Sequence, residues 1–181
     1  MTTVAIQGIR GSYSEEAALK MLGASVDLIE CRDFASTFET VSSKRAECAV
    51  IPLRNKIVGE IVAIGKLLSQ SELTILEEFD LEIRHVLVGR VDAVMDDVTS
   101  VRSHAEALKQ CSLFLAANPH IRQIAGGDTA TSISQVADEG RKQNAAIGSA
   151  RAAKIYGAKI LCEDIANDIN NWTTFGLIGQ Q

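Results

Sequence analysis

The stretch LTILEEFDLEIRHVLVGR (residues 73–90) decides how this chain divides. It favours extended structure throughout, and residues 81–88 alternate between apolar and polar side chains, as strands do when one side is buried. We interpret residues 76–88 as a segment that crosses from one lobe to another. This interpretation predicts a first lobe of residues 1–79 and 164–181 and a second lobe of residues 80–163.

On both sides of this stretch, short apolar runs alternate with segments of helical period. Residues 105–119 read as a single helix in this pattern, and residues 172–179 read as the closing strand. The alternation predicts an α/β fold of mostly parallel sheet flanked by helices. If residues 162–171 bring the chain back, the closing strand belongs to the first lobe. Thr173 and Thr174 would then lie at the hinge side of a cleft.

The composition excludes several classes of protein. The 181 residues carry a formal net charge of −5, and their basic residues do not gather into a stripe, so we expect no nucleic-acid partner. No basic leader precedes an apolar segment and no apolar run is long enough to span a bilayer, so we expect no membrane association and a cytoplasmic protein. The four cysteines stand far apart without metal-ligand spacing, which predicts reduced core thiols and no metal site: Cys31, Cys48, Cys111 and Cys162.

Four junctions between a strand and a helix carry small, amide or hydroxyl-bearing residues. They are Gly11-Ser12, residues 55–59, Ser103-His104 and residues 128–130. In open α/β sheets such junctions present free N–H groups to anions, although each one singly is more typical of an ordinary helix cap, and their joint occurrence is what points to a site. GIRGS (residues 8–12) satisfies neither the dinucleotide fingerprint nor the P-loop, so we expect no nucleotide cofactor.

The three histidines differ in their expected roles. His104 stands at a helix start, where it either lines a site or caps the helix. His85 lies inside an alternating strand and His120 in a polar turn, so we expect both to be structural. The chain contains no convincing nucleophilic triad, carboxylate pair or metal cluster, which predicts a site that holds an anion with hydroxyls, amides and cations.

These junctions resemble the motifs of the prephenate dehydratase catalytic domain over nearly the whole chain. The family's Gly-Pro-x-Gly-Ser-Phe-Ser is similar to residues 8–14 here, and its Pro-x-Glu-Asn-Ser-x-x-Gly to residues 52–59. Its Ser-His-x-x-Ala-Leu stands at residues 103–108, its Thr-Ala at 129–130, its Ala-Ala-Ile-x-Ser at 145–149 and its Thr-Arg-Phe at 173–175. Six motifs in the right order carry more weight than any one of them.

The resemblance implies two lobes of the type II periplasmic-binding kind, an active site in the cleft, no cofactor and a homodimer. It implies Thr173 as the catalytic proton donor, near Asn55 and Ser103. The family's C-terminal regulatory domain is not expected. The residues implied as substrate contacts are Gly11, Ser12, Arg54, Asn55, Lys56, Ser103, His104, Ala105, Thr129, Ala130, Thr174 and Phe175.

Three positions depart from the family's motifs. Thr174 replaces the arginine of Thr-Arg-Phe, and Arg54 and Lys56 replace the Glu and Ser that flank Asn55. Losing an arginine that grips the substrate's pyruvyl carboxylate would tilt the substrate, and Arg54 or Lys56 could restore the contact from another side. The alternative reading is that Arg54 and Lys56 are solvated loop charges, that Phe175 belongs to the core, and that both threonines simply favour a strand.

These departures leave three functions open. A tilted prephenate could lose CO2, keep its hydroxyl and be protonated on a ring carbon, as in the non-aromatising prephenate decarboxylases of secondary metabolism, and we place this reaction first. Dehydration of prephenate to phenylpyruvate, in phenylalanine biosynthesis, is the second possibility. The third is a degenerate domain that binds an anion without turnover, since a bilobed fold also suits binding proteins.

Overall fold

The computed structural model describes residues 1–180 and divides the chain into two compact units. Unit 1 comprises Met1–Ile9, Tyr13–Ile83 and Asn171–Gln181, and unit 2 comprises Arg10–Ser12 and Arg84–Asn170. The sequence placed the crossings at 79/80 and 163/164, several residues earlier in the chain. The observed boundaries between the units lie later in the chain because strand β5 (Thr74–Glu82) stays paired with β11 (Trp172–Gly179). This pairing continues as far as Glu82, which lies opposite Trp172.

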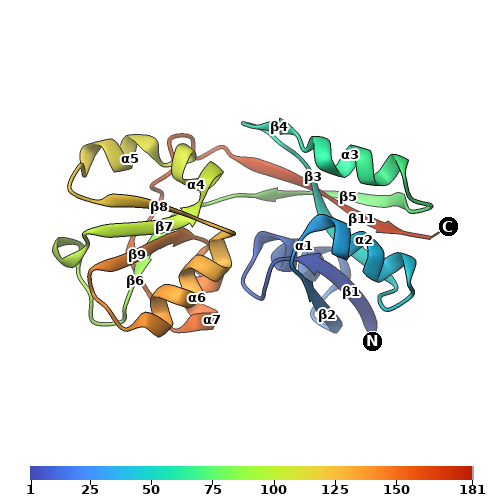
Figure 1. Ribbon diagram of the computed structural model, residues 1–181, viewed down its shortest axis with the longest axis horizontal. Helices are drawn as coiled ribbons and strands as arrows, with labels where there is room; N and C mark the ends of the chain where they lie inside the picture. The colour runs from blue at the N-terminus through green and yellow to red at the C-terminus, as the bar shows by residue number, and fades with distance from the viewer. Residues whose placement is uncertain (181) are drawn as a thin grey trace. The chain divides into compact units, whose positions relative to one another are not determined.

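Unit 1 is built on a sheet with the strand order β2-β1-β3-β11-β5, and β4 pairs with β3 (Figure 1). β1 runs parallel to β2 and β3, whereas β11 runs antiparallel to both of its neighbours. The remaining elements of unit 1 are β1 (Thr2–Gln7), α1 (Tyr13–Leu22), β2 (Val26–Cys31), α2 (Phe34–Ser42), β3 (Cys48–Asn55), β4 (Gly59–Glu60) and α3 (Val62–Ser69).

Each face of this sheet buries its own apolar cluster. The α1 face packs Ala17 and Ala18 against Val50, Phe175 and other strand residues. The opposite face, which carries α2 and α3, packs residues such as Phe38, Ile51 and Ile64 together with Ile178. Because β11 contributes side chains to both clusters, it is buried on its two sides, which accounts for its continuous apolar sequence.

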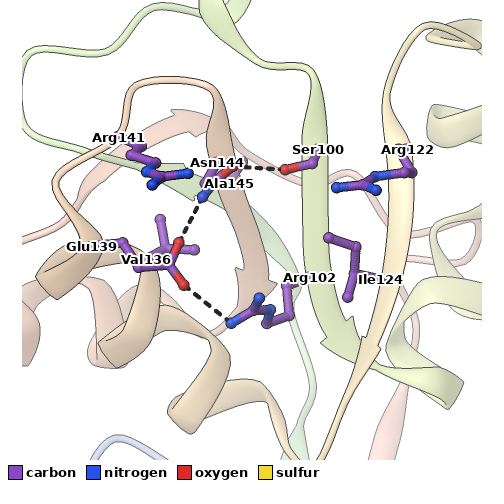
Figure 2. A pocket seen from close by; sticks show the side chains of 9 residues that line it. All are labelled: Ser100, Arg102, Arg122, Ile124, Val136, Glu139, Arg141, Asn144 and Ala145. Carbon is purple, nitrogen blue, oxygen red and sulfur yellow. Dashed lines mark hydrogen bonds and ion pairs between the residues drawn. The ribbon is translucent and has the colours of Figure 1, made fainter.

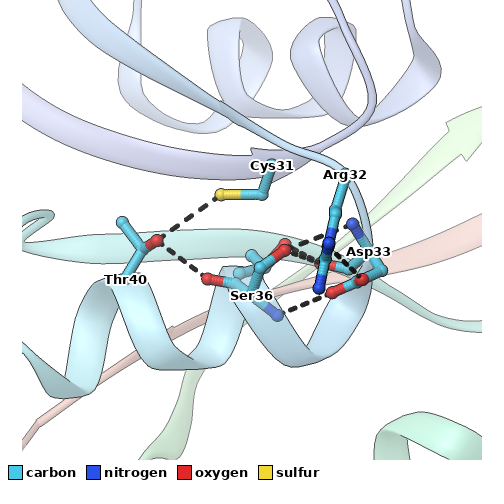
Figure 3. Close-up of polar contacts among 6 residues, drawn as sticks. Cys31, Arg32, Asp33, Ser36 and Thr40 are labelled. Carbon is cyan, nitrogen blue, oxygen red and sulfur yellow. Dashed lines mark hydrogen bonds and ion pairs between the residues drawn. The ribbon is translucent and has the colours of Figure 1, made fainter.

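Helix α2 begins with reciprocal hydrogen bonds that fix its first turn (Figure 3). The Asp33 carboxylate accepts from the Ser36 amide at 2.8 Å, and the Asp33 amide donates to Ser36 Oγ at 3.3 Å. Farther along, Thr40 Oγ1 donates to the Ser36 carbonyl at 2.8 Å and lies 3.6 Å from the buried sulfur of Cys31. The amide and hydroxyl of Ser36 lower the pKa of Asp33, so its carboxylate is the form that caps the helix.

Unit 2 is built on a second sheet with the order β10-β6-β9-β7-β8. β7 runs parallel to β8 and β9, while β6 runs antiparallel to β9 and β10. Both sheets are therefore mixed, and the expectation of mostly parallel sheet was wrong in this respect. The elements of unit 2 are β6 (Val86–Gly89), η1 (Met95–Asp97), β7 (Ser100–His104), α4 (Ala105–Gln110), α5 (Ser112–Ala117), β8 (Arg122–Gly126), α6 (Thr129–Glu139), β9 (Asn144–Gly148), α7 (Ala150–Tyr156) and β10 (Lys159–Cys162).

The segment expected as one helix at residues 105–119 is two helices that meet at Cys111. The backbone of Cys111 has φ −107° and ψ 19°, outside the helical region, and its side chain is fully buried in the core of unit 2. All four cysteines are free, and Cys31, Cys48 and Cys111 have the core positions expected of them, whereas Cys162 is partly exposed. Burial raises the pKa of Cys111 to about 12, which keeps this sulfur protonated.

Gly11 occupies a position that only glycine fits. Its φ is +87°, and a Cβ at this position would lie 2.9 Å from both Cα and Cβ of Ala152 in the same unit. We expect Gly11→Ala to lower the free energy of unfolding by roughly 2–5 kcal/mol, because it adds backbone strain to a steric clash. Urea denaturation measures this effect. Gly23→Ala is the matched control, since Gly23 has φ +82° but nothing within 4 Å, and equal losses in the two variants would contradict the steric argument.

His85 is a buried structural histidine, as expected from the sequence. Its side chain is 3% exposed, and Nε2 lies 2.9 Å from Gln110 Oε1. Burial lowers the pKa of His85 below 6.5, and the contact with Gln110 opposes this shift.

Because the pKa of His85 is lower in the folded chain than in the unfolded chain, the unfolded chain binds this proton first as the pH falls. Folding stability should therefore be complete above about pH 6.5 and decline below it, by at most about 1.4 kcal/mol per pH unit from this group. We expect His85→Gln to flatten this slope in urea titrations between pH 7.5 and 5. His120→Gln, at an exposed histidine, should leave it unchanged, and a slope unaffected by His85→Gln would refute the assignment.

Candidate functional site

Thr173 and Thr174 lie on opposite faces of the unit 1 sheet. Successive side chains of a strand alternate between its faces, so Thr173 shares a face with Phe175 of the α1 cluster. The strand register agrees: Thr173 stands opposite Asn55 and Leu81. Thr174 lies on the α2–α3 face instead, so the two hydroxyls cannot serve one small ligand side by side.

The side-chain amide of Asn55 forms hydrogen bonds with several neighbouring segments on the face of the sheet that carries Thr173. Its Nδ2 shares two protons among three acceptors: Thr173 Oγ1 at 2.9 Å, Asn171 Oδ1 at 2.9 Å and the Trp172 carbonyl at 3.0 Å. Its Oδ1 accepts from the backbone amides of the two residues that begin the turn after β3, Ile57 at 2.9 Å and Val58 at 3.1 Å. One side chain therefore fixes both the turn and the orientation of the Thr173 hydroxyl.

The Thr173 hydroxyl is held as an acceptor, which leaves its proton to be donated. A hydroxyl carries one donor and two acceptor sites, and the amide of Asn55 uses one of the acceptor sites. Among residues 1–180 no acceptor for the Thr173 proton is found, and 8% of the residue's surface is exposed. The expected proximity of Thr173 to Asn55 is confirmed, and the arrangement suits donation of a hydrogen bond to a ligand.

Thr174 and Arg54 are both engaged by carboxylates on the other face. Thr174 Oγ1 donates to Asp80 Oδ1 at 2.5 Å, and Arg54 forms an ion pair with Glu78 at 2.7 Å. The register places Thr174 directly opposite Arg54 and Asp80. The hydrogen bond that Arg54 donates to Glu78 raises the pKa of Arg54, which keeps it charged.

This arrangement explains two of the three departures from the family's motifs. The motifs have Glu at position 54 and Arg at position 174, and these positions are cross-strand neighbours on one face, where opposite charges attract. Here Arg54 turns to Glu78, while Thr174 bonds to Asp80. The third departure, Lys56, is exposed, and its backbone amide donates to the Trp172 carbonyl at 2.9 Å.

Phe175 is a core residue, with 2% of its surface exposed within the α1 cluster. Its expected role as a substrate contact therefore gains no support from its position. Two polar partners in unit 1 were not among the candidates from the sequence: Asn171, which is fully buried, and Asp80. Asn171 stood next to the closing strand in the sequence, but its pairing with Asn55 depends on tertiary structure.

In unit 2 the Ser-His motif ends β7 and starts α4. Ser103 is fully buried, and its hydroxyl donates to the Ile147 carbonyl at 2.7 Å, which fastens β7 to β9. His104 is exposed and caps α4, since its Nδ1 accepts from the Glu106 amide at 3.2 Å. Ala105, the first residue of α4, is exposed. Ser103 is therefore committed to the fold, and His104 is the exposed polar side chain of the motif.

The junction before α6 presents backbone groups. Asp128 caps the helix by accepting from the Thr131 amide at 2.7 Å and the Thr131 hydroxyl at 2.6 Å. Thr129 and Ala130 are the first two residues of α6, and Ala130 is fully buried. No acceptor for the amides of these two residues occurs within the described part of the chain, and they lie at the positive end of an eleven-residue helix.

The Gly11-Ser12 segment groups with unit 2. The Gly11 carbonyl accepts from Ser149 Oγ at 3.0 Å, and the Arg10 carbonyl accepts from Tyr156 Oη at 2.6 Å. Ser149 also caps α7, accepting from the Ala152 amide at 3.0 Å. The segment is thus anchored to α7, and Ser12 is 8% exposed.

Within residues 1–180, no cluster of three or more His, Cys, Asp or Glu side chains is placed to hold a metal ion. No helix in this part of the chain is both long and apolar enough to cross a membrane.

Three kinds of comparison relate this chain to known proteins. The sequence pattern of the family described as prephenate dehydratase matches residues 4–181. Arogenate dehydratase/prephenate dehydratase 1, chloroplastic, of Arabidopsis thaliana is 37% identical over 178 residues, which are 98% of this chain but 45% of that protein. The chain therefore spans less than half the length of this relative.

The solved structures give the same picture of the fold. Prephenate dehydratase from Arthrobacter aurescens in complex with L-Phe superposes with a TM-score of 0.90 at 27% identity, covering 99% of this chain and 60% of that one. A periplasmic substrate-binding protein of an ABC transporter from Coxiella burnetii superposes with a TM-score of 0.52 at 11% identity, covering 100% and 85%. The second likeness shows the periplasmic-binding type of fold alone.

Proposed function

The chain belongs to the prephenate dehydratase family, and from this membership we propose that it is a lyase that expels the ring carboxylate and the ring hydroxyl of prephenate, or of its amino-acid counterpart arogenate. The observation that carries the proposal is the Thr173 hydroxyl, oriented by Asn55 with its proton left for a ligand. The relatives named for dehydration favour loss of the hydroxyl over its retention. The preference for decarboxylation alone, drawn from the sequence, finds no support among them.

The proposed reaction requires a hydrogen-bond donor at the ring oxygen that leaves. When the bond to the ring carboxylate breaks, its electrons pass through the diene and expel the hydroxyl, and the ring becomes aromatic. Negative charge builds on the leaving oxygen as its bond to the ring lengthens, so a hydrogen bond to it strengthens in the transition state. In the proposal Thr173 gives that hydrogen bond, and Asn55 keeps its lone pair occupied so that the proton points to the substrate.

Carboxylate binding forms the other part of the proposal. The start of α6 suits a carboxylate, because the amide of the partly exposed Thr129 lies at the positive end of the helix dipole, with the buried Ala130 next to it. His104 would add a polar contact, while Gly11, Ser12, Ser103 and Ala105 would shape the backbone around it. Assembly as a homodimer and a location in the cytoplasm remain predictions.

Non-aromatising decarboxylation is the second candidate, and the charge change around Asn55 favours it. The motifs have an acid and a hydroxyl at positions 54 and 56, where this chain has Arg54 and Lys56. A change of this size could alter how a substrate with two carboxylates is held. Against this candidate, Arg54 is paired with Glu78 on the face opposite Thr173.

The test is to incubate the purified chain with prephenate and, separately, with arogenate, and to follow ultraviolet absorbance and product mass. We expect an aromatic product that is lighter by CO2 and water. A product lighter by CO2 alone would establish the second candidate. Unchanged substrate, in the presence of measurable binding, would show an anion-binding domain without turnover and overturn both.

A further inference from the structure

We propose that a pocket in unit 2, separate from the candidate catalytic residues, binds a small organic dicarboxylate through Arg122 and Arg141. The pocket has a volume of about 460 Å³ and lies at the start of strands β7, β8 and β9, against the last turns of α6 (Figure 2). Ser100, Arg122 and Asn144 are the first residues of those three strands. Neither the family match nor the proposed function assigns a role to it.

The pocket is distinct from the candidate site because it lies at the other end of the same parallel strands. His104 ends β7, and α6 begins beyond the end of β8, whereas the pocket is at the strands' beginning. The rise of a strand separates Ser100 from His104 by about 13 Å. A ligand in this pocket would therefore not occupy the place proposed for the substrate.

The net positive charge of the pocket lining favours a ligand with two negative charges. Arg102, Arg122 and Arg141 face a single acid, Glu139, so the lining carries two positive charges in excess. Glu139 is already satisfied: one oxygen accepts from Arg102 at 3.3 Å and the other from Asn144 Nδ2 at 2.6 Å. The excess charge therefore resides on the guanidinium groups of Arg122 and Arg141, which have no hydrogen-bond or ion-pair partner among the described residues.

The placement of the two arginines favours two separated carboxylates over one phosphate. Figure 2 shows Arg141 and Arg122 on opposite sides of the pocket, with their guanidinium groups pointing inward from different elements. Ile124 and Val136 add apolar surface to the lining. An arginine binds a carboxylate in a two-pronged contact, so each end of a dicarboxylate would pair with one guanidinium while its hydrocarbon part covers the apolar surface.

A rigid frame supports the pocket. Ser100 Oγ donates a hydrogen bond to Asn144 Oδ1 at 2.9 Å. Asn144 Nδ2 in turn donates to Glu139, and Glu139 also accepts from Arg102. Arg102 also donates to Gln135 at 2.7 Å. Because this chain of bonds is complete without Arg122 and Arg141, replacing either arginine should leave the fold intact.

The experiment is calorimetric titration of the whole chain with malonate, succinate, glutarate and benzene-1,3-dicarboxylate at a fixed ionic strength, since salt screens exposed charges. Inorganic phosphate and benzoate are the comparison probes. We expect at least one dicarboxylate to bind saturably and more tightly than either comparison probe. We also expect Arg122→Gln and Arg141→Gln each to weaken that binding by about tenfold to a hundredfold.

Arg32→Gln, at an exposed arginine of unit 1, should bind like the wild type, and thermal melts without probe should show that all three variants are folded. Absence of saturable dicarboxylate binding, equal affinity in the variants and the wild type, or tighter binding of phosphate than of every dicarboxylate would each overturn the proposal. The readout is binding alone, so the outcome does not depend on whether the chain turns over prephenate.

Discussion

Thr173→Val should reduce turnover of the substrate by about a hundredfold to ten-thousandfold while changing its affinity by less than tenfold. Valine keeps the shape of threonine but removes the proton that the leaving oxygen needs, and positioned proton donors contribute effects of this size. Asn55 retains its contacts with Asn171 and the Trp172 carbonyl in this variant, so the surrounding structure should survive. Steady-state kinetics with prephenate or arogenate, together with direct measurement of binding, separates the two quantities.

The neighbouring threonine supplies the control. Thr174→Val removes a hydroxyl from the same strand but from the opposite face, where it bonds to Asp80. Its turnover should stay within a few-fold of the wild type, while the free energy of unfolding should fall by roughly 0.5–1.5 kcal/mol, because one hydrogen bond is lost and the exposed Asp80 is solvated instead. Thr173→Ser should retain most turnover. Equal losses of turnover in Thr173→Val and Thr174→Val would contradict the assignment, because the two hydroxyls lie on opposite faces of β11 and only that of Thr173 is proposed to contact the substrate.

The division of the chain could be predicted because the crossing stretch and the closing strand both have strong patterns. Residues 73–90 are extended, as expected, but they form two strands in two different sheets, β5 and β6. The apolar pattern changes along this stretch, since β5 mixes apolar and acidic residues whereas β6 is apolar and buried throughout, but the sequence argument treated the two as one crossing segment. Strand direction was the other error, since β11 is antiparallel to its neighbours and burial on two faces looks alike in either direction.

The site was predictable in part. The motifs brought Thr173 and Asn55 together although they are 118 residues apart in the sequence. The period of a strand would also have placed Thr174 on the other face, and the sequence argument overlooked this when it treated both threonines as substrate contacts. The roles of Asp80 and Glu78 could not be foreseen, because they depend on the register between β5 and β11, which no local pattern specifies.

The same geometry changes how the departures from the motifs are read. Taken from the sequence alone, the loss of an arginine at position 174 looked like the loss of a substrate contact. In the structure position 174 faces away from Thr173 and lies opposite Arg54, so the two changes alter one cross-strand pair. Charges that change together on one face are evidence about packing there, and they carry less information about the reaction than the retained Thr173 and Asn55.

Asn55→Asp should lower turnover by about a hundredfold or more near neutral pH, with a smaller effect on folding. The carboxylate keeps an oxygen for the amides of Ile57 and Val58, so the turn after β3 should persist. It offers no proton to Thr173, however, and becomes an acceptor beside the hydroxyl. Thr173 would then donate its proton to residue 55 and no longer to the substrate.

This variant has a signature that a merely structural defect would lack. The oxygen of Asn171 faces the new carboxylate, and repulsion between two acceptors favours its protonated form, so the pKa of the introduced acid should lie above that of an ordinary aspartate. Once protonated, the acid can again donate to Thr173 Oγ1, and turnover relative to the wild type should recover as the pH is lowered. Asn55→Leu, which cannot donate at any pH, should show no such recovery. A relative rate for Asn55→Asp that is flat with pH would mean that Asn55 shapes the turn without orienting the Thr173 proton.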